Sequence, residues 1–144
     1  MTAEEFETLS IKRVIPATKD RLFRAWTQPE ELRKWWTIGE GWRAEFAEID
    51  LRVGGKFKVG NRPRRGELVL LSGEFLEIDP PNRLVYTWQF GLTNPGQSII
   101  TVEFKEVGDK TEVSITHEHS PKDMGPAAVA GWESILEGLK SFVG

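Results

Sequence analysis

The spacing of hydrophobic and polar residues changes twice along the chain, and these changes predict a series of distinct elements. In residues 9–15, apolar and polar residues alternate well enough for a β-strand. The stretch PATKDRLFRAWTQPEELRKWW then takes the spacing of a helix. Thr18 can cap a first helix, and Pro29 suits the first position of a second. We therefore expect one strand followed by two short helices.

From Ala44 to His119 the period is two, and turn-forming sequences such as VGGK, DPPNR and VGDK interrupt it. This pattern predicts an antiparallel meander of about six strands. After HSPKDMGP the helical spacing returns and predicts one long helix. Its apolar stripe consists of Val129, Trp132, Leu136, Leu139 and Val143, with Ile135 and Phe142 beside it. The order of elements indicates an α+β fold in which a curved antiparallel sheet wraps the last helix.

Composition narrows the class of protein. A chain of 144 residues suits a single domain spanning residues 1–144, and no apolar run approaches the ~20 residues of a membrane-spanning helix. The net charge of −3 gives no general attraction to nucleic acid or to membranes. The acidic N-terminus lacks the features of a signal peptide, so we expect a cytoplasmic protein. The absence of cysteine excludes disulfides and thiolate chemistry.

Several stretches resemble one known family, in the same order along the chain. They are RLFRAWTQPEELRKWW, EIDLRVGGKF, GEFLEIDPPNRLVYTW, VEFKEVGDKTEVSITHE and GWESILEGLKSF. They are similar to the domain related to the C-terminal part of the heat-shock protein 90 ATPase activator, in the START-like or SRPBCC superfamily. The resemblance runs from Ile11 to Phe142, nearly the whole chain. It implies a helix-grip fold with an apolar cavity between the sheet and the long C-terminal helix.

The resemblance implies no single activity, because the superfamily includes lipid carriers, hormone receptors, polyketide cyclases and a co-chaperone. Two departures from the family concern the start of the first helix and the mouth of the cavity. Thr18 stands where the family often has proline. TIGEGW follows the paired tryptophans where Gly-Pro is common. The resemblance therefore does not determine the shape of the cavity mouth.

Six tryptophans and eight phenylalanines predict either an aromatic core or a cavity lined with rings. Gly131 and Gly138 lie seven apart on one side of the long helix, where each costs about 1 kcal/mol, so we expect space to be needed there. That space can hold either packed rings or a ligand. The candidate cavity residues are Trp35, Trp36, Tyr86, Trp88, His117, Gly131, Trp132, Ile135 and Gly138.

The stretch EIDLRVGGKFKV does not fit a phosphate-binding loop, since Asp50 replaces the first glycine of that motif and a strand follows the lysine. Alternation predicts Ile49, Leu51 and Val53 on one strand face and Glu48, Asp50 and Arg52 on the other, a solvated outer face. Asp50 and Arg52 are expected to pair with each other or across strands. A polar row inside the cavity is the alternative. Gly54 and Gly55 are expected to supply positive φ angles for a tight hairpin.

Candidates for chemistry are few. His117 and His119 are expected to share the inward face of one strand, but no third metal ligand is evident, so neither a metal nor a cofactor is expected. Glu77 and His117 are the candidates for acid/base catalysis, although Glu77 suits an exposed position better. No catalytic residue is assigned, and an enzyme is the less favoured interpretation.

Arg62 and its neighbours Arg64 and Arg65 concentrate positive charge in GNRPRRGE. A solvated hairpin tip is the expected explanation, and docking to an acidic partner is the alternative. Without an aromatic stacking platform beside the arginines, nucleic-acid binding has little support.

The leading hypothesis is a non-enzymatic domain that binds a small apolar or aromatic molecule between the long helix and the sheet. The second is a co-chaperone or protein interaction module, which we rank lower because the full activator carries a separate N-terminal domain and few residues precede the first strand here. The third is a cyclase-like or hydrolase-like enzyme that uses Glu77 or His117.

Overall fold

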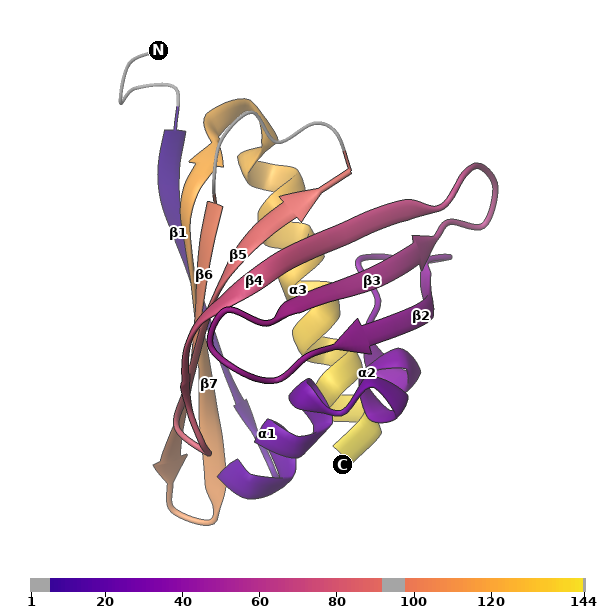
Figure 1. Cartoon of the computed structure of the whole chain (residues 1–144). Coiled ribbons are helices and arrows are strands. Elements are labelled where there is room, and N and C mark those ends of the chain that lie inside the picture. The colour runs from indigo at the N-terminus through magenta and orange to yellow at the C-terminus, as the bar shows by residue number, and fades with distance from the viewer. Residues whose placement is uncertain (1–5, 92–97, 144) are drawn as a thin grey trace.

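The computed structural model describes residues 6–91 and 98–143, and in it one antiparallel sheet curves around the last helix (Figure 1). The strands are β1 (Phe6–Ile15), β2 (Arg43–Ile49), β3 (Lys56–Arg62), β4 (Val69–Asp79), β5 (Arg83–Phe90), β6 (Ser98–Val107) and β7 (Lys110–Pro121). The helices are α1 (Lys19–Thr27), α2 (Pro29–Trp35) and α3 (Gly125–Val143), and a 3₁₀ turn, η2 (Lys122–Met124), precedes α3.

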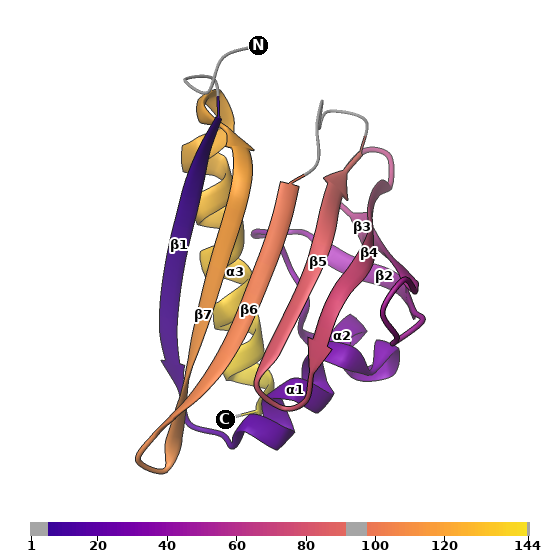
Figure 2. The same cartoon turned by 60° about the vertical axis from the view of Figure 1, so that its left-hand side comes forward.

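The seven strands lie in the order β1-β7-β6-β5-β4-β3-β2, so the first strand pairs with the last and the others follow as a meander (Figure 2). This arrangement confirms the α+β helix-grip fold expected from the sequence. The expected strand, pair of short helices, six further strands and long helix are all present. The long helix starts at Gly125, earlier than its apolar stripe indicated.

The core lies between the concave face of the sheet and α3. Strand β7 shows how alternation builds it, because Val113 and Ile115 are fully buried while Ser114 between them is partly exposed. From α3, Trp132, Leu136 and Leu139 are buried against this face. Full burial of a large apolar side chain contributes about 1.5–3 kcal/mol, so this layer holds the helix on the sheet.

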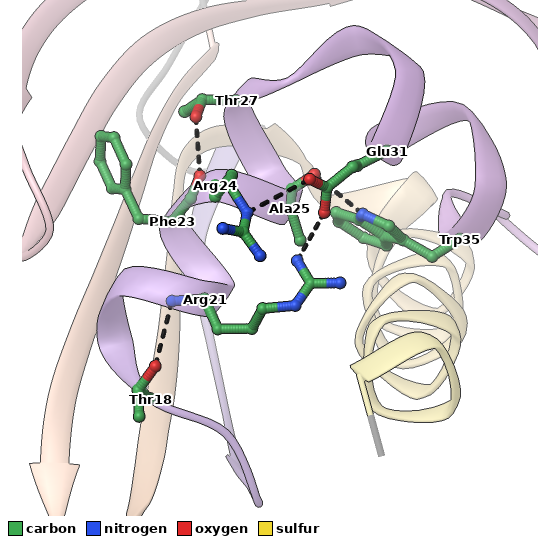
Figure 3. A network of polar contacts seen from close by, with 8 residues as sticks. All are labelled: Thr18, Arg21, Phe23, Arg24, Ala25, Thr27, Glu31 and Trp35. Carbon is green, nitrogen blue, oxygen red and sulfur yellow. Dashed lines mark hydrogen bonds and ion pairs between the residues drawn. The ribbon is translucent and has the colours of Figure 1, made fainter.

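The two short helices are fixed to each other by the contacts in Figure 3. Thr18 caps α1, as expected, with its hydroxyl accepting a hydrogen bond of 3.2 Å from the backbone N–H of Arg21. From α2, Glu31 accepts a hydrogen bond from the guanidinium group of Arg21 and forms an ion pair with Arg24. The indole N–H of Trp35 donates to the carbonyl oxygen of Ala25 over 3.0 Å. These contacts give α1 and α2 a defined position near the C-terminal end of α3 (Figure 1).

The segment after β2 corrects two expectations. The strand ends at Ile49, so alternation does not continue, and Leu51 and Val53 are exposed at 38% and 67% instead of facing the core. Gly54 has the expected positive φ of 86°, but Gly55 does not have one. Gly55 is required for a different reason, since a Cβ there would lie 2.1 Å from a backbone oxygen of Asp50. Of the two pairings expected for Asp50 and Arg52, the structure has the one within the segment, with Arg52 Nε 2.9 Å from Asp50 Oδ2.

Candidate functional site

A cavity of about 290 Å³ lies between the N-terminal half of α3 and the sheet. It is lined by Ile38, Trp88, Phe90, Ser98, His117, Ser120, Pro121, Met124, Ala127, Ala128, Gly131, Trp132 and Ile135. Helices α1 and α2 lie near the other end of α3 (Figure 1), so they leave this half of the helix without their cover. Met124 is 49% exposed, which places the opening of the cavity at η2 and the start of α3.

The structure brings five of the residues singled out in the sequence together at this cavity. They are Trp88, His117, Gly131, Trp132 and Ile135. The other lining residues were not singled out, although the positions of Ala127 and Ala128 relative to Gly131 are a usable signal. Ala127 and Gly131 are four apart on α3 and Ala128 is three before Gly131, so small residues share one face of the helix and leave room above it.

The other four candidates lie outside the cavity. Trp35 and Trp36 are buried, with Trp36 packed behind the cavity at 6.2 Å from the ring of Trp88. Tyr86 belongs to a separate, nearly filled gap, where its ring contacts Phe57 edge-on at 5.1 Å. Burial of the hydroxyl raises the pKa of Tyr86 well above its ordinary value.

Gly131 and Gly138 have different roles in the structure, contrary to the expectation that both provide space between the long helix and its neighbours. A Cβ on Gly131 would meet nothing nearer than the carbonyl oxygen of Ile38 at 3.9 Å, so a side chain can be added there without a clash, at the wall of the cavity. A Cβ on Gly138 would lie 2.3 Å from the carbonyl oxygen of Trp35. Gly138 is therefore a point of close contact between α3 and the end of α2.

Two tryptophans and one histidine form the inner wall of the cavity. The rings of Trp88 and Trp132 are 4.9 Å apart, and the ring of His117 lies 5.7 Å from Trp88. The indole N–H of Trp132 donates to Nδ1 of His117 over 3.0 Å. Burial lowers the pKa of His117 to about 4, so the imidazole is neutral near pH 7.

His119 corrects a further expectation, because it does not share the inward face with His117. Its φ of 61° breaks the alternation of β7, and the pairing of β7 with β1 shifts register between Glu7 and Leu9. The ring of His119 stacks on Phe6 with centroids 3.8 Å apart, and Ser120 takes the buried position. Within residues 6–91 and 98–143 no group of three His, Cys, Asp or Glu side chains could hold a metal ion.

Glu77 lies away from the cavity, on the exposed side of β4. It is half exposed, and its carboxylate lies 3.0 Å from Nε of Arg83. The structure therefore does not bring the two acid/base candidates together.

The arginine-rich hairpin tip is partly neutralised by nearby carboxylates. Arg62 donates to both carboxylate oxygens of Glu45 over 3.1 Å, and this hydrogen bonding lowers the pKa of Glu45. Arg64 lies 3.9 Å from Glu40. These pairs agree with a solvated tip.

The fold and the cavity together define a helix-grip protein with an apolar pocket under its long helix. Residues 16–144 match the family described as activator of Hsp90 ATPase homolog 1-like protein. The match extends over most of the chain, so the protein belongs to this family. None of the curated proteins matches the chain. No helix in the described part of the chain is long and apolar enough to cross a membrane.

Solved structures share the architecture. Protein CV1439 from Chromobacterium violaceum is 29% identical with a TM-score of 0.84, and the match covers 94% of this chain and 96% of that one. A protein from Rhizobium leguminosarum is also 29% identical, with a TM-score of 0.79 and coverage of 96% and 94%. An AHSA1-like protein from Aeromonas hydrophila is 24% identical with a TM-score of 0.79 over 95% and 92%, a likeness that concerns the fold alone.

Proposed function

We propose that the protein binds a small apolar or aromatic molecule in the cavity between α3 and the sheet, and that it does so without catalysing a reaction. The observation that carries this proposal is the cavity of about 290 Å³ that Gly131 lines within a wall of mainly apolar side chains. Ligand sites are typically concave and apolar with a few polar groups, and this wall has that character. A cytoplasmic location belongs to the same proposal.

The composition of the wall supports binding rather than catalysis. Of the described lining residues, His117 alone carries an ionisable side chain. General acid/base catalysis needs a group whose pKa lies near the working pH, whereas the pKa of His117 is lowered to about 4. Glu77, the other candidate, is paired with Arg83 outside the cavity.

The family description favours a second candidate function, a co-chaperone-like interaction with an ATPase. Stimulation of a chaperone's ATPase rate by the purified protein would support this function. The two candidates are separable, because substitutions inside the cavity should affect ligand binding and leave an ATPase effect that depends on the outer surface unchanged.

The experiment that tests the first proposal uses N-phenyl-1-naphthylamine, an uncharged dye whose fluorescence rises in apolar surroundings. The native protein should bind it, and Gly131→Leu should weaken binding at least tenfold by filling the cavity. Ala130→Leu is the matched control, because Ala130 is an exposed neighbour on the same helix that does not line the cavity. Native mass spectrometry of freshly purified protein would show a retained ligand directly. No dye binding, or equal loss in both variants, would contradict the proposal.

A further inference from the structure

The imidazole of His117 has a hydrogen-bond partner at one nitrogen and, within the described part of the chain, none at the other. Its side chain is on the cavity wall, and the residue is only 4% exposed. Nδ1 accepts the indole N–H of Trp132 over 3.0 Å. Nε2 is buried and has no hydrogen-bond partner among the residues that the structure describes.

The bond from Trp132 decides which nitrogen carries the proton. An indole N–H can only donate, so Nδ1 must be the unprotonated, accepting nitrogen. A neutral imidazole then carries its proton on Nε2. The low pKa of His117 agrees with a neutral ring. His117, which lines the cavity, therefore carries a buried N–H donor whose direction is fixed by the hydrogen bond at the other ring nitrogen.

A buried N–H donor without an acceptor costs free energy, because it has lost its hydrogen bond to water. A ligand that supplies the acceptor recovers this free energy on binding. We propose that the cavity selects an uncharged, largely apolar molecule with one hydrogen-bond acceptor, such as a carbonyl oxygen, which accepts the Nε2–H of His117. This inference rests on the proposed function and adds the chemical class of the ligand.

The described part of the wall carries no charged side chain, and this favours an uncharged ligand. Among the described lining residues there is no Asp, Glu, Lys or Arg. Ser98 already donates its hydroxyl to the carbonyl oxygen of His119 over 2.9 Å. A carboxylate or ammonium group on the ligand would lose its hydration in this cavity without gaining an opposite charge.

The same geometry gives the ligand a direction. His117 lies beside the two indoles at the buried inner wall, whereas half-exposed Met124 lies where the cavity meets solvent. The acceptor therefore enters first, and the flat apolar body lies along Trp88 and Trp132 with its far end toward Met124.

The test compares 2-acetylnaphthalene with 2-isopropenylnaphthalene, which has the same shape but a methylene group in place of the carbonyl oxygen. Both compete with N-phenyl-1-naphthylamine. The ketone should bind the native protein at least tenfold more tightly than the alkene, although the alkene is the more apolar. 2-Naphthoate, an anion, should bind more weakly than the ketone.

The variant His117→Phe should abolish the preference for the ketone. The ratio of the two affinities is the readout, because a change in cavity shape affects both probes alike. His119→Asn is the matched control and should keep the ratio, since asparagine tolerates the positive φ at that position. It also leaves His117 as the single histidine. In this control, the ¹H–¹⁵N spectrum of the ring should show a proton on Nε2 that shifts with the ketone and not with the alkene.

Each remaining outcome overturns the inference. Equal binding of ketone and alkene, which a water molecule on Nε2 would produce, leaves the proposed function standing and removes the acceptor requirement. Tightest binding by 2-naphthoate shows an anion site instead. A proton on Nδ1 contradicts the assigned tautomer. Failure of both probes and of the dye to bind removes the inference together with the proposed function.

Discussion

The backbone of Trp35 leaves no room for a side chain at Gly138, because the Trp35 carbonyl oxygen lies 2.3 Å from the place that a Cβ on Gly138 would occupy. Real Cβ atoms do not approach other atoms so closely. The end of α2 and the C-terminal half of α3 are therefore in contact through a glycine.

The substitution Gly138→Ala should destabilise the protein. Alanine gains up to about 1 kcal/mol of helix propensity, but separating α3 from the end of α2 should cost more, typically 1–3 kcal/mol for overpacking. Urea unfolding followed by tryptophan fluorescence measures the difference. An unchanged or higher free energy of unfolding would show that the two helices are not in close contact at this glycine.

Gly131→Ala should have the opposite effect. The nearest atom to the added Cβ is 3.9 Å away, at ordinary van der Waals distance, so the helix gains propensity without a clash. We expect a gain of about 0.5–1 kcal/mol, or roughly 2–4 °C in Tm for a chain of this size. Calorimetry of the two glycine variants side by side checks the contrast, and a loss of stability in Gly131→Ala would mean that the cavity is closed at this point.

The buried hydrogen bond between Trp36 and Asn61 should contribute to the free energy of unfolding. Asn61 is 1% exposed, and its Oδ1 accepts the indole N–H of Trp36 over 3.1 Å. Trp36→Phe leaves this oxygen without its donor, which should cost about 1–3 kcal/mol in addition to the smaller ring. Trp42→Phe, at a partly exposed tryptophan, is the control and should change stability by about 0.5 kcal/mol or less. Similar losses in both variants would contradict the prediction.

The lowered pKa of His117 should make the stability of the protein depend on pH. The pKa of His117 is about 4 in the folded protein and 6.5 when unperturbed, so between these values the unfolded chain binds a proton that the folded protein does not. The free energy of unfolding therefore has its full contribution from His117 above about pH 6.5. It falls by up to about 3 kcal/mol as the pH drops to about 4.

Denaturant titrations of the native protein and His117→Gln across this pH range check the prediction. Carboxylates also titrate there, so the difference between the two curves is the relevant quantity. The native protein should lose stability more steeply toward acid, and parallel curves would show that His117 is exposed to water or charged in the folded state.

Alternation along the strands was sufficient to place His117 in the interior, because the pleat from Val113 onward is uninterrupted as far as that residue. The same reasoning failed two residues later, at His119, since a single positive φ reverses the side on which the next side chains lie. Nothing in the local sequence identifies this break. The pairing partner on β1, where the register shifts, is distant in the chain.

The two glycines of α3 show a second limit of reasoning from the sequence. Seven residues bring a helix back to nearly the same face, so spacing alone assigns Gly131 and Gly138 the same role. Their roles differ because α2 ends beside Gly138 and not beside Gly131, and the position of α2 depends on contacts such as that between Trp35 and Ala25. Ile38 was missed for the same reason, as its place on the cavity wall follows from where α2 ends.

The pairing of β1 with β7 also has a consequence for biosynthesis. Ile15 lies opposite Thr111, so the first strand leaves the ribosome long before its neighbour has been translated. Contacts between residues so far apart in the chain slow folding, because a long loop must close before they form. Until α3 follows, Trp36 also lacks its contact with Trp132. The nascent chain therefore carries an unpaired strand edge and uncovered aromatic surface through most of its synthesis.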